Sequence, residues 1–351
     1  MPSPVGLLSS DGLFLILAFP GLALLLLSIF LGFGTLFLRW RGTRKVDRWS
    51  RLREEWNSQI LEVLAGSLEP DILVKSVQRE EGLNFLDFLA EYVRRIRGEE
   101  RVTLNAMARP FLPSLLEHLK DRLAERRAGA VQTLGLFGMP EYANVLRDAL
   151  EDPSALVSMA AARSLLSPGQ VDHLQDVMDH LHRFSQWHRA VLAQLLAKVG
   201  PDAAALLHQA LMDSGHPLRI RAVVAHALRI LRDVESADLA TQVLESETDR
   251  ELTVECLRLL AEVGESRHRG SVLPLLYHPD FPIRAQALRA LRAVGSPEDL
   301  SLFSEGMKDE SPWVAMEAAR GMRFLGGMQE LQAMAASPGS RSVLAQQVLA
   351  E

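Results

Sequence analysis

The residues best suited to chemistry in this sequence are histidines and acids between positions 171 and 188. If the segment 171–181 is helical, His173, Asp176 and His180 lie on one face, three and seven residues apart, a spacing that can hold a metal ion. A solvated or partner-facing helix explains the same pattern with fewer assumptions. We therefore predict no metal site and keep a metal-dependent hydrolase or hydroxylase as the alternative.

Other catalytic signatures are absent from the sequence. It contains no glycine-rich phosphate loop, no nucleophile elbow and no cysteine–histidine arrangement. The single cysteine, Cys256, excludes an intrachain disulfide framework and a multi-cysteine metal site, and we interpret it as a small core residue. The sequence thus predicts a protein that is not an enzyme and uses no cofactor.

The elements that carry these side chains recur along the chain. The stretch Ile283–Gly295 has counterparts at steps of 31 or 32 residues, and a period of this length predicts a solenoid whose units bury their apolar faces against one another. The seven units start at Arg126, Val157, His188, Ile220, Leu252, Ile283 and Val314. Eight residues into each unit stands a residue of what we call the leucine column: Leu134, Leu165, Leu196, Leu228, Leu260, Leu291 and Met322.

A glycine column follows four residues later in each unit. Glycine at this place predicts a left-handed residue at the end of the first helix of the unit, and a second helix then precedes a turn with proline. The glycine column comprises Gly138, Gly169, Gly200, Arg232, Gly264, Gly295 and Gly326.

This pattern resembles the HEAT-repeat family, in its short bacterial version D-P-x-x-x-V-R-x-x-A-x-x-A-L-x-x-x-G, over about Arg109 to Pro338. The resemblance implies an all-α fold: an α-solenoid of about seven to eight two-helix repeats, with the second helices on the inner face. HEAT-like metal hydroxylases carry paired His-Glu dipeptides, and this sequence has none. The resemblance also implies bonds between neighbouring repeats from arginines at the second position of a unit to aspartates that we place in the preceding turns: Arg127, Arg189, Arg221 and Arg284, with Asp152, Asp213 and Asp280.

The surface of the second helices is the predicted binding surface. Aromatic and arginine residues often contribute most of the binding energy of an interface, so such residues and their polar neighbours are the candidates. They are Tyr142, Arg147, His173, Asp176, His180, His208, Gln209, Gln242, Arg269, Tyr277 and Lys308.

The segment Leu13–Leu38 contains no charged residue and would extend roughly 39 Å as a helix, enough to span a bilayer. We predict one transmembrane helix rather than a cleaved signal peptide, because no Lys or Arg precedes it. The flank from Arg39 to Trp56 has a net charge of +4, which places the tail 1–12 outside and the rest of the chain in the cytoplasm, at the inner membrane. The flank residues Arg39, Trp40, Arg41, Arg44, Lys45 and Arg48 also suit anionic headgroups, so a peripheral anionic-lipid sensor is another hypothesis.

Residues 39–108 read as this basic flank followed by a helical linker or cap, and residues 109–351 as the solenoid. The net charge of −9 over residues 57–351 argues against nucleic acid as a partner. Together these features predict a membrane-anchored scaffold, or an accessory subunit, that presents a cytoplasmic repeat surface to a membrane-associated protein partner. An assembly for envelope polysaccharide synthesis or secretion is one candidate setting.

Overall fold

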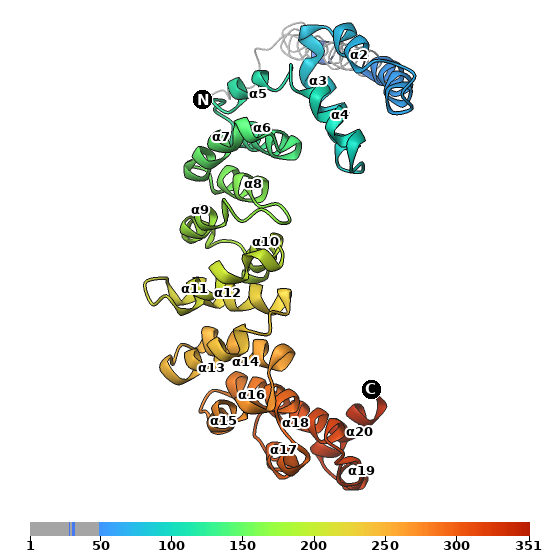
Figure 1. Cartoon of the computed structure of the whole chain (residues 1–351). Coiled ribbons are helices and arrows are strands. Elements are labelled where there is room, and N and C mark those ends of the chain that lie inside the picture. Colours follow the sequence, from blue (N-terminus) through green and yellow to red (C-terminus); the bar gives the residue numbers. More distant parts are fainter. Residues whose placement is uncertain (1–27, 29, 32–48) are drawn as a thin grey trace, which may run out of the picture. The chain divides into compact units, whose positions relative to one another are not determined.

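The computed structural model describes residues 28, 30, 31 and 49–351 (Figure 1). Apart from these first three residues, the predicted transmembrane helix Leu13–Leu38 lies outside the described residues, as does the flank up to Arg48. Within the described part, no single helix is long and apolar enough to cross a membrane; one pair bent by 103°, Arg189–Ala197 with Pro201–Met212, passes by length and composition. The chain divides into two compact units, Met1–Phe111 and Leu112–Glu351.

The described part of the first unit is a small helical body with an aromatic core. Trp56, Phe85 and Phe88 are at most 2% exposed, and the rings of Trp56 and Phe85 meet edge to face with their centroids 5.1 Å apart. Its helices span residues 49–64, α2 (Pro70–Ser76), η1 (Arg79–Glu81), α3 (Gly82–Val93) and α4 (Glu99–Ala108).

The second unit is an α-solenoid of two-helix repeats, which confirms the predicted all-α repeat fold (Figure 1). After the short α5 (Pro113–His118), a first helix begins at or within three residues of each predicted unit start, and α20 follows as the next helix of that row. The first helices are α6 (Ala124–Phe137), α8 (Ala155–Leu165), α10 (Arg189–Ala197), α12 (Leu218–Leu231), α14 (Arg250–Val263), α16 (Phe281–Val294), α18 (Pro312–Phe324) and α20 (Ser340–Ala350).

The second helices are shorter and are often extended by 3-10 turns. No strand occurs among residues 49–351. The second helices are α7 (Ala143–Asp148), α9 (Leu174–Asp179), α11 (Ala204–Met212), α13 (Ser236–Ser246), α15 (Arg269–Val272), α17 (Leu300–Gly306) and α19 (Met328–Ala336). The turns are η2 (Pro140–Tyr142), η3 (Ala149–Glu151), η4 (Leu181–Phe184), η5 (Pro201–Ala203), η6 (Ser266–His268), η7 (Leu273–Tyr277) and η8 (Pro297–Asp299).

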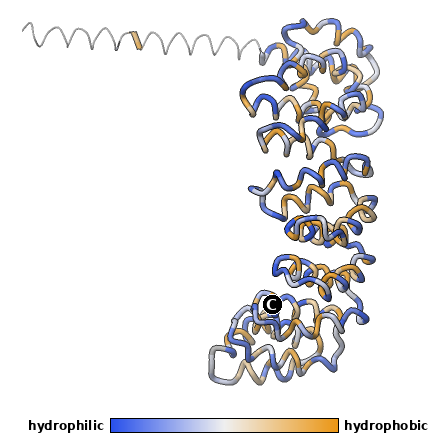
Figure 2. The backbone as a smooth tube through the Cα atoms, turned by 90° about the vertical axis from the view of Figure 1, so that its left-hand side faces the viewer, coloured by the Kyte–Doolittle hydropathy of each residue, from blue (hydrophilic) through white to orange (hydrophobic). Residues whose placement is uncertain are grey.

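The core of the solenoid follows the predicted columns. Every residue of the leucine column is at most 3% exposed, so the register of the repeat is confirmed. Figure 2 shows hydrophobic residues recurring at each level of the stack, with hydrophilic residues in the loops. Burial of these apolar side chains between successive units is the main force that holds a solenoid together.

The glycine column serves two different purposes. Its members in the first four units and the last have φ between +53° and +94°, as predicted, and this includes Arg232, the one described non-glycine residue with positive φ. The prediction is wrong at Gly264 and Gly295, whose φ values are −70° and −84°. There a Cβ atom would lie 2.4 Å from the Leu260 carbonyl oxygen or 2.5 Å from that of Leu291, so close packing requires glycine.

Arg127, Arg221 and Arg284, at the second position of their units, bind a carboxylate in the next turn along the chain, whereas Arg189 lies 3.3 Å from Glu251. Arg284 binds both carboxylate oxygens of Asp309 at 2.7 and 2.9 Å, and Arg127 binds those of Asp152 at 2.8 Å. The predicted aspartate Asp152 thus binds Arg127, whereas the prediction is wrong for Arg284, whose partner is Asp309 and not Asp280. The arginine spans its own unit from the start of the first helix to the turn after the second, and its remaining N–H group binds carbonyl oxygens of the turn before.

The C-terminal part of the solenoid bends between α14 and α20 (Figure 1). The first helices α16, α18 and α20 lie on the inner side of this bend, and the second helices α17 and α19 lie on its outer side. This differs from the expectation that second helices line the inner face.

Candidate interaction surface

The polar residues predicted on the second helices mostly pair with the neighbouring unit. Each pair joins residues 25 to 30 positions apart, about one repeat. Arg147 Nε donates to Asp176 at 3.0 Å, His208 Nε2 lies 2.6 Å from an oxygen of Asp233, the Tyr277 hydroxyl donates to Glu305 at 3.1 Å, and Arg269 binds both oxygens of Asp299. These side chains tie successive repeats together.

Asp299, the partner of Arg269, is a buried carboxylate with several hydrogen bonds. Its side chain is 1% exposed, and the hydrogen bonds from Arg269 hold its pKa below the usual aspartate range despite the opposing effect of burial. A second carboxylate hydrogen bond comes from the Ser296 backbone N–H at 2.9 Å. This aspartate is a charged structural group whose partners are supplied by the fold.

The histidine cluster that could have held a metal ion is used in the same way. Asp176 is bound by Arg147 and lies 3.3 Å from His173 Nδ1, while Nδ1 of His180 lies 2.6 Å from the Asp176 backbone oxygen. In the described part of the chain, no three His, Cys, Asp or Glu side chains are arranged to hold a metal ion. The cluster therefore links α7 to α9 and presents two partly exposed imidazoles.

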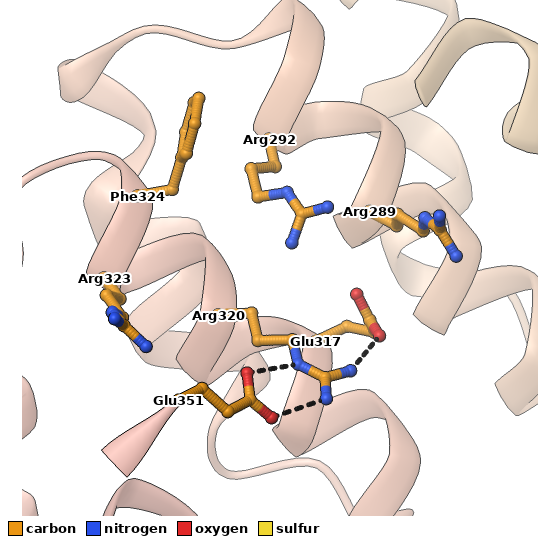
Figure 3. Close-up of a pocket in the computed structure, with 7 residues that line it drawn as sticks. All are labelled: Arg289, Arg292, Glu317, Arg320, Arg323, Phe324 and Glu351. Carbon is orange, nitrogen blue, oxygen red and sulfur yellow. Dashed lines mark hydrogen bonds and ion pairs between the residues drawn. The ribbon is translucent and has the colours of Figure 1, made fainter. Parts of the chain in front are cut away.

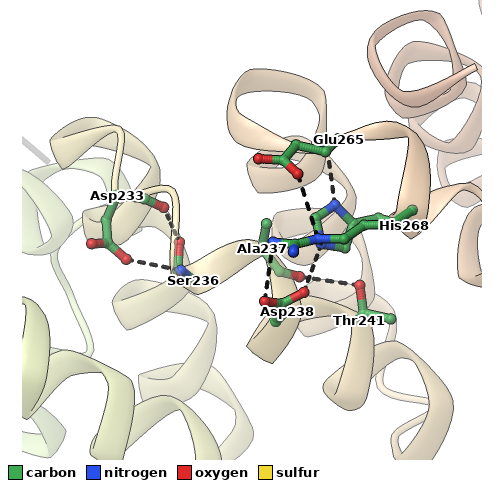
Figure 4. A network of polar contacts seen from close by, with 8 residues as sticks. Asp233, Ser236, Ala237, Asp238, Thr241, Glu265 and His268 are labelled. Carbon is green, nitrogen blue, oxygen red and sulfur yellow. Dashed lines mark hydrogen bonds and ion pairs between the residues drawn. The ribbon is translucent and has the colours of Figure 1, made fainter.

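A further polar network lies between α13 and α15 (Figure 4). His268 is 3% exposed, its Nε2 lies 2.8 Å from Asp238, and its Nδ1 accepts the Glu265 backbone N–H at 2.9 Å. The hydrogen bond with His268 lowers the pKa of Asp238. The network fixes the start of one second helix against its neighbour, so it is structural.

The remaining predicted residues do not converge on one site. Gln209 and Gln242 are exposed on α11 and α13, and Tyr142 ends η2. Tyr277 and Lys308 line one cavity of about 490 Å³ together with Glu305 and Asp309.

A cluster of like charge lies on the first helices instead. A cavity of about 620 Å³, which we call the arginine cavity, lies over α16 and α18 (Figure 3). Four guanidinium groups face two carboxylates there, so the lining has a net charge of +2 at neutral pH. It is lined by Arg289, Arg292, Glu317, Arg320, Arg323, Phe324 and Glu351.

The four arginines differ in how far they are neutralised. Arg320 binds both oxygens of Glu351, at 2.7 and 3.1 Å, and one oxygen of Glu317 at 3.0 Å. These bonds raise the pKa of Arg320 and lower that of Glu351. Arg323 donates to the Val348 carbonyl at 2.6 Å.

The two arginines of α16 are much less engaged. Arg289 is 3.7 Å from Glu262, too far for a hydrogen bond, and its side chain is 40% exposed. Arg292 has no hydrogen bond or ion pair with any described residue, and Figure 3 shows it pointing into the space between Phe324 and Arg320. Phe324 is 68% exposed, so an aromatic ring stands beside unneutralised positive charge.

The acid that pairs with an arginine within α14 and within α18 is missing from α16, which lies between them. Three residues before Arg258 in α14 and Arg320 in α18 stand Glu255 and Glu317, and each glutamate binds its arginine, at 2.8 and 3.0 Å. In α16 the equivalent residue is Gln286, whose buried side-chain oxygen has no hydrogen-bond partner. Arg289 therefore lacks the intrahelical acid that Arg258 and Arg320 have, as does Arg163 of α8, which follows Ala160 at the same spacing.

Sequence reasoning missed the arginine cavity because it looked for binding residues on the second helices. A signal was present: the sixth and ninth positions after each unit start carry arginine in several units, as in Arg258, Arg289, Arg292, Arg320 and Arg323. Alignment of the units by their leucine column brings these arginines into two rows.

A family model described as HEAT repeats matches residues 112–184, 237–323 and 271–343, just over half of the chain. No curated protein matches the sequence. Among solved structures, Kap121p is similar with 14% identity and a TM-score of 0.44; the match covers 80% of this chain, which spans only 38% of Kap121p. Human deoxyhypusine hydroxylase is similar with 16% identity and a TM-score of 0.31, covering 79% of this chain and 98% of that one. An engineered protein is similar with 18% identity and a TM-score of 0.31, covering 60% and 96%.

Proposed function

Because this chain belongs to the HEAT-repeat family, we propose that it is a non-enzymatic scaffold whose solenoid binds a protein partner. The observation that carries the proposal is the arginine cavity on the inner side of the bend, where exposed arginine and phenylalanine lie on rigid helices. Arginine and aromatic residues are the types that most often dominate interface energies. A solenoid offers such residues at little cost in ordering, because each repeat is already held by its neighbours.

The same proposal includes anchoring of the chain in the inner membrane. Its support is the charge-free stretch Leu13–Leu38 followed by the basic flank from Arg39, which favours a cytoplasmic solenoid. An anchor confines the solenoid near the membrane and raises its effective concentration toward partners there. We therefore propose a membrane-associated partner, such as a subunit of an envelope polysaccharide synthesis or secretion assembly.

The test is affinity purification of the full chain from its own membranes in mild detergent, with mass spectrometry. A variant that ends at Arg109 keeps the predicted anchor and lacks the solenoid, so it is the matched control. Recovery of one specific protein with the full chain alone is the expected result. Recovery of the same proteins with both chains, or of none above background, would contradict the scaffold function.

A carbonate and salt wash of the membranes tests the anchor separately. An integral chain stays in the membrane fraction after both treatments, whereas a chain held by headgroup charge is released by salt. Release of the full chain by salt would refute anchoring and leave the scaffold function open.

A further inference from the structure

We propose that the arginine cavity recognises a short acidic segment of the partner protein, and that Glu351 partly occupies the cavity until such a segment binds. This inference rests on the proposed scaffold function and adds the chemistry of the partner. Arg289 and Arg292, one helical turn apart on α16, carry the positive charge of the cavity that is least engaged: Arg289 makes only a long ion pair of 3.7 Å with Glu262, and Arg292 has no ion pair with a described residue.

The geometry favours carboxylates as the ligands of this cavity. One arginine of the cavity already shows the preferred mode, since Arg320 takes the Glu351 carboxylate with two N–H groups at 2.7 and 3.1 Å. Arg292 and Arg323 also attract Glu351, because both lower the pKa of its carboxyl group. Glu351 therefore fills part of the cavity as a carboxylate ligand supplied by the chain itself.

The lining also indicates a peptide rather than a simple anion. The exposed ring of Phe324 stands at the cavity beside Arg292 and Arg323, and it suits an apolar side chain next to an acidic one. A volume of about 620 Å³ is large enough for several side chains. An acidic segment with interspersed apolar residues satisfies both the charge and the ring.

Two substitutions change the charge of the cavity without removing a buried contact. Gln286→Glu gives α16 the acid that α14 and α18 have, so Arg289 becomes neutralised within its own helix. Glu351→Gln removes the internal carboxylate and exposes Arg320. The first variant is expected to bind an acidic peptide several-fold more weakly than the natural chain, and the second several-fold more tightly.

The direct loss variant is Arg289→Gln with Arg292→Gln. Each arginine is expected to make a charge-assisted hydrogen bond to the peptide, so the double variant is expected to lose about tenfold or more in affinity. Arg163→Gln is the matched control, because Arg163 is an exposed arginine in the same row on α8, outside the cavity.

The experiment measures binding of a fluorescein-labelled peptide of about ten residues, rich in glutamate and leucine, to the full chain in mild detergent. Its control peptide carries glutamine in place of every glutamate. Tighter binding of the acidic peptide, with weaker binding by the double variant and by Gln286→Glu and tighter binding by Glu351→Gln, would support the proposal.

Other outcomes overturn it. These are equal binding of both peptides, an equal loss with Arg163→Gln, or tighter binding of inorganic phosphate, phosphatidylglycerol vesicles or a single-stranded oligonucleotide in competition. The membrane purification separates the two proposals. A partner recovered equally by the full chain and by the double variant leaves the scaffold function standing and refutes the role of the cavity.

Discussion

The leucine column predicts a large loss of stability from a single substitution in the middle of the solenoid. Leu228 lies in α12 and is 0% exposed, with α10 packed against one side of its helix and α14 against the other. Leu228→Ala removes three side-chain carbon atoms from this site and leaves a cavity between three first helices. Such substitutions cost about 2 to 5 kcal/mol, and the cost rises where the surroundings cannot collapse.

The expected loss for Leu228→Ala is about 3 to 4 kcal/mol, because helices on both sides hold the walls of the cavity apart. Leu218→Ala in the same helix is the matched control, since Leu218 is 39% exposed. The chemical change is the same in both variants, with Leu218 at the first position of α12 and Leu228 in its interior. Because its side chain is exposed, the control is expected to lose less than about 1 kcal/mol.

The assay is urea unfolding of the full chain, followed by circular dichroism for the whole helix content. Because repeat arrays can unfold in parts, the slope of the transition is compared between variants as well as its midpoint. A broadened or split transition in Leu228→Ala would show that the solenoid separates at this unit. A loss well below 1 kcal/mol, or one equal to that of Leu218→Ala, would refute the packing argument.

Three further predictions follow from single contacts. Arg284 lowers the pKa of Asp309 in the folded chain, so the pair stabilises the folded chain at pH values above the unfolded pKa of about 3.8, and this stability is lost as the pH falls through the folded pKa. The urea midpoints of the natural chain and of Arg284→Gln should therefore converge at the acid end of a pH series. A difference between the midpoints that stays constant with pH would contradict this. Gly295→Ala is expected to lower the free energy of unfolding by about 1 to 3 kcal/mol in the same assay, because its Cβ atom would lie 2.5 Å from the Leu291 carbonyl oxygen. Gly270→Ala is the control and should cost nothing, because a Cβ atom at Gly270 would have no neighbouring atom within 4 Å. Burial raises the pKa of the Cys256 thiol to about 12, so it should react with a thiol reagent at about pH 8 only after unfolding, and fast reaction in the folded chain would refute its burial.

The repeat register was predictable because one residue type recurs at one position in every unit. The conformation of the glycine column was only partly predictable, as Gly264 and Gly295 show. Glycine is selected either for a positive φ or for the absence of a Cβ atom, and both reasons give the same residue. The choice depends on the backbone conformation at the helix end and on close neighbours such as Val294 at Gly264, which the sequence does not state.

The family resemblance predicted bonds from the second-position arginines to aspartates that we placed in the preceding turns. Arg284 is four residues from Asp280 and 25 residues from Asp309, yet Asp309 takes both of its paired N–H groups. The second helix returns the chain to the start of the first, so the later turn lies nearer in space. Asp280 binds Arg250 of the previous first helix instead, at 2.6 Å.

The predicted binding residues were chosen by type, and type alone does not separate a binding residue from an inter-repeat tie. Arg147 with Asp176 and Arg269 with Asp299 are complementary charges 29 and 30 residues apart, close to the repeat length. Residues one repeat apart on second helices are neighbours in the stack, so opposite charges at that spacing predict a tie. Applied before the structure was known, this rule would have removed both arginines from the candidates.

The same periodicity also predicts which face of the first helices is free to bind. At about 100° per residue, the sixth position of a unit lies about 160° around the helix from the eighth, opposite the leucine column. An arginine at the sixth position therefore points away from the core in every unit, and neighbouring units stack these arginines into a row of like charge. Acids among the arginines reduce the repulsion within this row in α14 and α18, where Glu255 and Glu317 lie. A unit that has glutamine at the acid's position, as α16 has at Gln286, leaves its positive charge for a partner. The difference between α16 and its two neighbours α14 and α18 marks the site.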